Sequence, residues 1–268
     1  MNPLPTAGDI AGFLDQLAPS ALAEDWDNTG LLVGRRESVV TDVLTCLTLT
    51  PDVATEAIKK GVSLIVTHHP VMFRAVRQLT GDTVEGRMLL ALIEARIAVY
   101  SPHTSFDSAL QGINQQLAEA FGLLDVRPIR PDAMDESIGA GRWGHLPEEV
   151  SLPVFLATVR SGCSARYLEY SGMNRSTVKT VAVACGAAGE FLDDARRLGC
   201  DTFVTGEGRF HSALEARNNG VTLIFTGHYS SERPAVEWLA NRIGSEFSEV
   251  TSVASVEERD PLELYTDE

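Results

Sequence analysis

"TCLTLTPDVATEAIKKGVSLIVTHH", residues 45–69, decides the fold of this chain. An apolar run is followed by a turn, a helical pattern, Gly61 and a second apolar run that ends in His68 and His69. This order of strand, helix and strand is typical of a βα unit with buried, parallel strands. Because similar apolar runs alternate with amphipathic segments along most of the chain, we predict an α/β fold with largely parallel sheets.

A second stretch follows the same course, "VACGAAGEFLDDARRLGCDTFVTGE" at 183–207. Gly61 precedes Thr67 by six residues, and Gly199 precedes Thr205 by six. We interpret the match as a duplication, with one α/β repeat at 1–125 and another at 126–268, each a sheet flanked by helices. The alternative is a pair of ordinary βα units, which resemble one another without common origin. Prolines, glycines and charges at 126–144 favour a boundary there.

Metal-binding residue types gather just after the predicted strands. His103 is followed four residues later by Asp107, and His228 is followed four residues later by Glu232. Ligands of open α/β folds bind at the carboxyl ends of the strands, so we expect these side chains to share one crevice. The full set is His68, His69, His103, Asp107, Glu207, His228 and Glu232.

Imidazole and carboxylate ligands together suit zinc, manganese, iron, cobalt or nickel. Neighbouring side chains on an extended chain diverge, so His68 and His69 can serve two ions rather than chelate one. Asp107 and Glu232 can then complete or bridge the coordination shells, leaving positions for water or substrate. The alternative is that the histidines are structural, as many buried histidines are.

Composition excludes several classes of function. The formal net charge of −15 argues against a nucleic-acid or anionic-membrane surface spread over the whole molecule. The four cysteines are isolated singles, so we expect reduced thiols. No signal peptide or membrane-spanning run is apparent, which predicts a cytoplasmic location. The acidic segment "EERDPLELYTDE" at 257–268 has the composition of a solvated tail.

Smaller features leave alternatives open. The "CGAAGE" turn at 185–190 is either an anion cradle at a helix N-terminus or an ordinary tight turn. Ser101 and Cys185 are conceivable nucleophiles without a supporting motif, and Arg209 is a candidate for holding an anionic substrate. No dinucleotide fingerprint or Walker loop is present, so we assign no cofactor-binding residues other than metal ligands.

Four segments together carry a likeness to a known family: "LAEDWDNTGLLVG" at 22–34, "VTHHPVMF" at 66–73, "SPHTSFDSALQGINQQLAEAFGL" at 101–123 and "TGEGRFHSALEARNNGVTLIFTGHYSSERPAVEWLA" at 205–240. The chain resembles the NIF-three-like dinuclear-metal-centre family, whose members are also called GTP cyclohydrolase I type 2 homologues. The likeness covers nearly the whole chain, with the motifs in the family's order.

The resemblance implies two intertwined α/β repeats assembled as a toroidal homo-hexamer, with two divalent metal ions per chain. On that pattern the segment from about residue 226 can pack with the first repeat. The family's metal ligands fall on His68, His69, Asp107, His228 and Glu232. His103 corresponds to a site residue that shuttles protons or orients a ligand, and Glu207 lies at the family's "TGE" position.

The chain departs from the family at one point. Where the family often has Asp in an "LDVT" element, this chain has Thr48 in "LTLT", so no role is assigned to a carboxylate there. Asp27 and Asn28 belong to the shared N-terminal signature and form either a structural turn or a wall of the cleft.

Two functions remain in competition. The first is a metal-dependent hydrolase of a small phosphorylated or nucleotide-like substrate, with His103 or Glu207 moving protons. The alternative is a non-enzymatic protein that stores or delivers metal, or serves as a metal-dependent scaffold or regulator. A small anionic ligand fits the first, because bound cations would dominate the local field despite the acidic chain.

Overall fold

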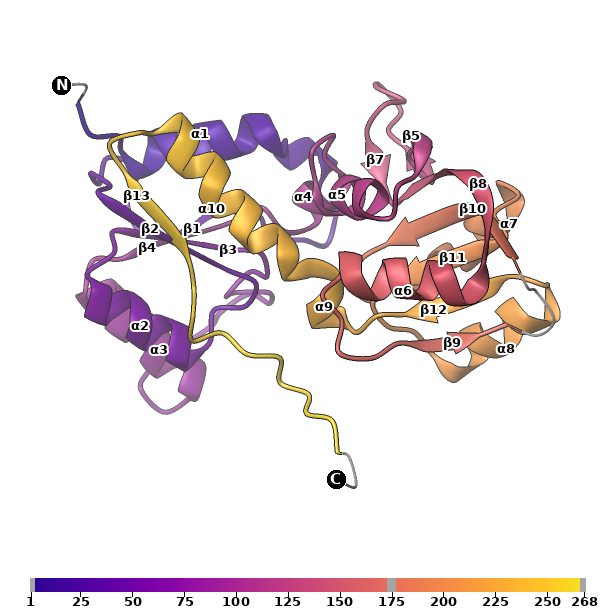
Figure 1. Ribbon diagram of the computed structural model, residues 1–268. Helices are drawn as coiled ribbons and strands as arrows, with labels where there is room; N and C mark the ends of the chain where they lie inside the picture. The colour runs from indigo at the N-terminus through magenta and orange to yellow at the C-terminus, as the bar shows by residue number, and fades with distance from the viewer. Residues whose placement is uncertain (1–2, 173–176, 266–268) are drawn as a thin grey trace. The chain divides into compact units, whose positions relative to one another are not determined.

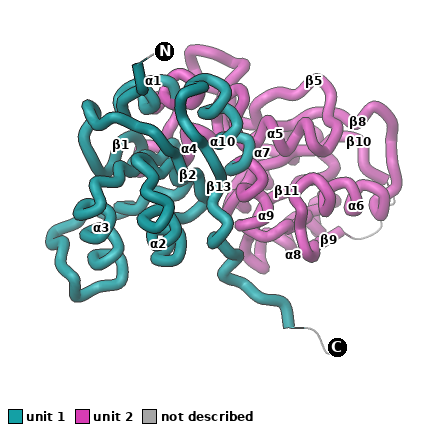
Figure 2. The backbone as a smooth tube through the Cα atoms, turned by 60° about the vertical axis from the view of Figure 1, so that its left-hand side comes forward, with its two compact units in different colours: residues 1–13, 28–102, 236–268 teal, residues 14–27, 103–235 magenta. Residues whose placement is uncertain are grey.

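The computed structural model describes residues 3–172 and 177–265 (Figure 1). Two compact units divide the chain, and each draws on more than one segment (Figure 2). Unit 1 comprises residues 1–13, 28–102 and 236–268, and unit 2 comprises residues 14–27 and 103–235. The predicted repeats at 1–125 and 126–268 stay a prediction, because internal repetition and spatial clustering are different properties.

Unit 1 is built on a five-stranded sheet with the order β1-β4-β3-β2-β13. Its strands are β1 (Gly30–Val33), β2 (Asp42–Cys46), β3 (Leu64–Thr67), β4 (Ala98–Ser101) and β13 (Thr251–Ala254). The last four are parallel neighbours, and β1 pairs antiparallel with β4. Residues 42–67 therefore form a parallel β2–α2–β3 unit, as predicted.

The helices of unit 1 lie on both faces of its sheet (Figure 1). They are α1 (Ala7–Leu17), which continues into unit 2, α2 (Pro51–Lys60), α3 (Val84–Glu94) and α10 (Pro234–Glu246), whose first two residues belong to unit 2. One core packs Leu44, Ile65 and Val99 of the strands against Val53 and Leu92 of α2 and α3. Alternate strand residues face the other way, and Thr45 accordingly donates a hydrogen bond to the carbonyl of Val236.

Local sequence explains where α2 begins and ends. The Thr50 side chain accepts a hydrogen bond from the backbone of Val53, and Pro51 occupies the first turn. Gly61 ends the helix in the left-handed region, with φ +66°. These caps place the next strand, and with it the two histidines that follow.

Unit 2 contains a six-stranded sheet with the order β5-β8-β10-β11-β12-β9. Its strands are β5 (Leu124–Arg127), β8 (Arg142–Ser151), β9 (Glu169–Ser171), β10 (Thr177–Ala184), β11 (Thr202–Thr205) and β12 (Thr222–Phe225). Strands β10, β11 and β12 are parallel, whereas the other three pairings are antiparallel. The expectation of largely parallel sheets is thus wrong for unit 2, because β8 and β9 lie outside the βα pattern.

The helical segments of unit 2 are η1 (Ser20–Leu22), α4 (His103–Ser108), α5 (Ile113–Ala120), α6 (Leu152–Gly162), η2 (Gly189–Phe191), α7 (Leu192–Arg197), α8 (Phe210–Asn218) and α9 (His228–Glu232). A small ladder joins β6 (Arg130–Pro131) and β7 (Gly139–Ala140) within the proline- and glycine-rich segment. One core packs Phe191, Leu192 and Ala195 against Phe203 and Leu223 of the sheet.

The acidic segment from residue 257 is packed at its start. Glu258 is 5% exposed and accepts hydrogen bonds from the backbone of Leu47 and Thr48, at 3.0 and 2.6 Å. The expectation of a solvated tail is wrong there, because the carboxylate is satisfied by two amides rather than by water. Among the described residues, no helix combines the length and apolar composition needed to cross a membrane.

Candidate metal centre

The paired histidines of unit 1 directly extend the parallel ladder of β2 and β3. The amides of His68 and His69 donate to the carbonyls of Cys46 and Leu47, at 2.9 and 2.8 Å. His68 is 3% exposed, and its carbonyl accepts a 2.6 Å hydrogen bond from Ser101. The two imidazole rings lie 5.1 Å apart between centroids. The sheet therefore holds both rings at its carboxyl edge, where the sequence predicted them.

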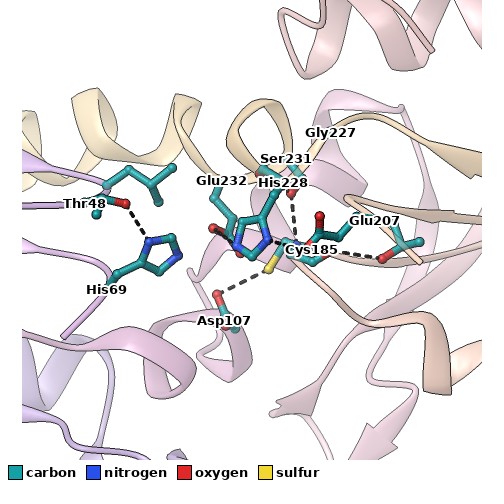
Figure 3. Close-up of polar contacts among 12 residues, drawn as sticks. Thr48, His69, Asp107, Cys185, Glu207, Gly227, His228, Ser231 and Glu232 are labelled. Atoms are coloured by element: carbon teal, nitrogen blue, oxygen red, sulfur yellow. Dashed lines mark hydrogen bonds and ion pairs between the residues drawn. The ribbon is translucent and has the colours of Figure 1, made fainter. Parts of the chain in front are cut away.

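His69 is oriented by the turn after β2. Its Nδ1 atom lies 2.7 Å from the Thr48 hydroxyl (Figure 3). With Nδ1 facing this hydroxyl, a metal would be bound through Nε2. The residue that departs from the family pattern therefore contacts a predicted metal ligand.

In unit 2, the three parallel strands end level with one another, since Ala184 pairs with Thr205 and Thr205 pairs with Phe225. Helix α9 follows β12 and begins at His228. One helical turn later Glu232, which is 3% exposed, places Oε2 3.1 Å from Nε2 of His228. The i,i+4 spacing noted in the sequence thus brings these two predicted ligands together.

Glu207 contacts the other nitrogen of the same imidazole. Its Oε1 atom lies 3.0 Å from Nδ1 of His228 (Figure 3). Two carboxylates therefore flank one histidine, and they raise its pKa to about 9, with the hydrogen bond to Glu232 the largest cause. A carboxylate at Nδ1 is the usual device for orienting a metal-binding histidine.

The "CGAAGE" turn makes room for Glu232. Gly186 has φ +63°, and a Cβ atom at this position would lie 2.4 Å from Oε1 of Glu232. Its amide is hydrogen-bonded at 3.0 Å to the hydroxyl of Ser231, one residue before Glu232. Of the two interpretations of this turn, the geometry favours the tight turn, because the amide binds the protein's own helix α9.

Helix α4 carries His103 and Asp107. His103 opens the helix with φ +35°, a sparsely populated conformation for a residue with a side chain. Its Nδ1 lies 2.6 Å from Oδ1 of Asp27, and the other carboxylate oxygen of Asp27 accepts from the amide of Thr104. Asp27 therefore caps α4 and orients His103, a role that the sequence left undecided.

Sequence reasoning missed two neighbours of Asp107. The Cys185 thiol donates to Oδ1 of Asp107 at 3.3 Å, and the side-chain amide of Asn114 donates to the Asp107 carbonyl at 3.1 Å. Asn114 also accepts from the amide of Cys185. Burial raises the pKa of Cys185 well above its ordinary value, so this cysteine is a neutral donor and not a thiolate nucleophile.

Negative charge is concentrated in unit 2 at these residues. Burial and then the charge of Glu232 raise the pKa of Asp107 to about 7. Burial by itself lowers the pKa of His103, but the hydrogen bond to Asp27 and the nearby carboxylates, Asp107 among them, outweigh it and raise the pKa. Two carboxylates that disfavour each other's ionisation form a site suited to a cation.

The donor set fits a divalent metal ion. His68, His69, His103, His228 and Glu232 are among the described side chains that could hold one. Neutral imidazole with carboxylate is the ligand chemistry of zinc and of other first-row divalent ions.

A pocket of about 600 Å³ lies beside Glu207 in unit 2. Its lining residues include the acidic Glu190, Asp193, Glu207 and Glu215 and the basic Arg209. The pocket can therefore accept hydrogen-bond donors of a small molecule, and Arg209 supplies one positive group for an anionic part.

Comparison with known proteins gives consistent matches over most of the chain. The family model described as Duf34/NIF3 (NGG1p interacting factor 3) matches residues 5–261. A "GTP cyclohydrolase 1 type 2 homolog" of Clostridium perfringens is 33% identical over 262 residues, covering 96% of this chain and 98% of the relative. "NIF3-like protein 1" of Drosophila melanogaster is 30% identical over 253 residues, covering 93% of this chain and 86% of the relative.

Solved structures share the fold. The Bacillus cereus protein related to NIF3 superposes with a TM-score of 0.90 at 21% identity, covering 98% of this chain and all of that one. Staphylococcus aureus protein SA1388 gives a TM-score of 0.88 at 27% identity, covering 97% and 99% of the two chains.

Proposed function

The chain belongs to the Duf34/NIF3 family, and from this premise we propose that it is a metal-dependent hydrolase of a small phosphorylated or nucleotide-like substrate. Two divalent metal ions, of zinc, manganese, iron, cobalt or nickel, are bound by His68, His69, Asp107, His228 and Glu232. The observation that carries the proposal is the buried carboxylate of Glu232, 3.1 Å from His228 and electrostatically opposed to Asp107. Such a cluster gains most from a cation.

The bound ions supply Lewis acidity, which polarises a phosphoryl or carbonyl oxygen and activates water. The remaining work falls to the protein. Asp27 holds His103 by Nδ1, so His103 exchanges protons with the substrate through Nε2. Glu207 orients His228 and lines the pocket, where it is the second candidate for moving a proton.

Substrate binding is assigned to the pocket beside Glu207. Its carboxylates favour a substrate portion rich in N–H donors, such as a nucleobase or an amino group. Arg209 can pair with a phosphate of the same molecule. This combination supports a nucleotide-like substrate, and the names of the bacterial relatives point to the same substrate class.

Metal analysis tests the proposal first. Protein purified without an affinity tag is expected to carry divalent metal, and Glu232→Gln to lose most of it because the charge that balances the cation is removed. Glu246→Gln, an exposed carboxylate on α10, is the matched control and is expected to retain metal. Wild-type protein that neither contains metal nor takes up zinc, manganese, iron, cobalt or nickel would contradict the site.

Turnover separates the hydrolase from the second candidate function. The family description as an interacting factor favours a non-enzymatic, metal-dependent scaffold, regulator or metal store. For a hydrolase, His103→Ala is expected to keep its metal while hydrolysis of nucleotides or phosphate esters falls about 100-fold. Metal-loaded wild type without turnover on any such substrate would leave the non-enzymatic function.

Assembly is a separate part of the proposal. We expect a homo-hexamer in the cytoplasm, by analogy with the family. Light scattering coupled to size-exclusion chromatography measures the mass directly, and a mass six times that of one chain is the expected result. A monomer at micromolar concentration would contradict it.

A further inference from the structure

The chain returns to the β2–α2 turn of unit 1 after leaving β13. Strand β13 runs parallel to β2, and the amide of Ser255 continues the ladder with a 2.8 Å hydrogen bond to the carbonyl of Thr45. Residues 255–258 then pass alongside the turn, and we call them the clasp segment. Ser255 and Glu258 are 2% and 5% exposed. The clasp segment is therefore part of the folded unit.

Two buried carboxylates, Glu56 on α2 and Glu258 in the clasp segment, connect the clasp segment to the β2–α2 region. Glu56 on α2 accepts hydrogen bonds from the Ser255 hydroxyl and from the amides of Val256 and Glu257. In turn, the two carboxylate oxygens of Glu258 accept hydrogen bonds from the backbone amides of Leu47 and Thr48. Each carboxylate satisfies backbone donors of the other segment, so the turn and the clasp segment fix one another.

The contacts of Glu258 lead directly to a predicted metal ligand. Oε1 of Glu258 lies 2.6 Å from the Thr48 amide, and the Thr48 hydroxyl lies 2.7 Å from Nδ1 of His69. We propose that Glu258 is a positioning residue for His69, acting through Thr48 so that His69 carries its proton on Nδ1 and offers Nε2 to metal. The consequence for metal binding rests on the proposed function, whereas the effect on the His69 ring does not.

The geometry explains why a carboxylate is required. Each oxygen of Glu258 accepts from a different amide, and neither acceptor can be replaced by an NH₂ group. In Glu258→Gln one amide must face another donor, so the turn has to shift. A shift of the Thr48 backbone moves its hydroxyl away from His69, because side chain and backbone are joined through one Cβ.

The first readout is made without metal. In ¹⁵N-histidine NMR of chelator-treated protein, wild-type His69 is expected as the Nδ1–H tautomer, and Glu258→Gln is expected to shift it toward a mixture. Thr48→Val, which removes the hydroxyl at nearly constant shape, should cause the same shift. Glu257→Gln is the matched control, since that neighbouring side chain is exposed. The tautomer in Thr48→Val also tests the route if Glu258→Gln fails to fold.

The second readout is metal affinity, measured by competition with a chelator. Glu258→Gln and Thr48→Val are each expected to lower affinity about 10-fold. Because both act along one route, the double variant should lose little more than either single variant. Glu257→Gln should match wild type.

The outcomes separate the two proposals. Unchanged His69 tautomer and metal affinity in folded Glu258→Gln, with thermal stability alone reduced, would overturn the positioning role. Wild-type protein that binds no metal would overturn the proposed function, while the tautomer shift would still establish that Glu258 positions His69.

Discussion

The two βα units that resemble each other in sequence build their strand ends in different ways. In unit 1 the turn after β2 is filled: Thr48 contacts His69, and Glu258 enters from a distant segment to bind the turn's amides. In unit 2 the corresponding turn is empty of side chain at Gly186, and Glu232 occupies the space. The turn of unit 1 is stabilised by the carboxylate of Glu258, whereas the turn of unit 2 has a glycine that leaves space for the carboxylate of Glu232.

The difference shows that the same backbone course can support predicted metal ligands in two ways. Where the strand itself ends in predicted ligands, as at His68 and His69, a side chain of the turn contacts one of the rings. Where the predicted ligand comes from a helix, as with Glu232 on α9, the turn leaves room for it. Substitutions in the two units test this difference between the turns and the charges around them.

Gly186→Ala is expected to have the largest effect. Its Cβ would lie 2.4 Å from Glu232, so the carboxylate must move and metal affinity should fall about 100-fold. The positive φ adds about 1–2 kcal/mol of strain. Gly61→Ala in unit 1 is the matched control, because it has φ +66° but nothing within 4 Å of the added Cβ. Chelator competition and thermal unfolding measure both effects; equal metal affinities in the two variants would contradict the space-clearing role of Gly186.

Glu56→Ala is expected to lower the free energy of unfolding by about 2 kcal/mol. The buried carboxylate satisfies Ser255 and two backbone amides and lies 2.6 Å from Lys60, so its loss leaves these groups without their acceptor. Urea denaturation measures the change. A loss below about 0.5 kcal/mol would mean that the clasp segment is not held by this side chain.

The pH dependence of the metal-free protein tests the charge cluster of unit 2. The pKa of Asp107 is raised from 3.8 to about 7, so between these pH values the folded protein binds a proton at Asp107 that the unfolded chain does not. The stabilisation is complete below about pH 4 and is lost as pH rises toward 7, so the Tm should fall by a few degrees across this window. Asp107→Asn should flatten the fall. Scans between pH 4 and 6.5 avoid most of the titration of His228, and an identical slope in the variant would show that Asp107 is not the group responsible.

Asp193→Ala is expected to have the smallest effect. Asp193 on α7 pairs with Arg196 and Arg197 at 3.3 and 3.7 Å, but all three side chains are largely exposed. Exposed ion pairs contribute little, so the free energy of unfolding should change by less than about 0.5 kcal/mol. Glu56→Ala is the comparison in the same denaturation assay, and a loss as large as that of the buried Glu56 carboxylate would contradict the small contribution expected of these exposed ion pairs.

Local periodicity was enough to predict the parallel core of both units. The strand ending at Thr67, the glycine at Gly61 and the i,i+4 pair of His228 and Glu232 are all readable within ten residues of sequence. Such features depend on neighbours along the chain, where backbone geometry is restrictive. The fold class and the position of most candidate ligands were therefore accessible.

Contacts between distant segments were not accessible in the same way. Asp27 and His103 are 76 residues apart, and Glu258 and Leu47 are 211 apart. The composition around Glu258 is that of a solvated tail, and nothing local indicates that one of its six carboxylates is buried. The Asp27 signal was present in the N-terminal signature, but a signature does not say which partner its carboxylate meets.

The division of the chain also bears on the order in which the protein folds during synthesis. Every residue of unit 2 precedes residue 236, whereas the sheet of unit 1 takes its edge strand β13 from residues 251–254. Unit 1 begins first on the ribosome and is completed second, after unit 2 has emerged. Until β13 has been synthesised, β2 lacks its neighbour at the edge of the sheet, and the turn after β2, whose Thr48 contacts His69, lacks Glu258. A nascent chain therefore cannot complete the turn that contacts His69 until the segment with β13 and Glu258 has emerged.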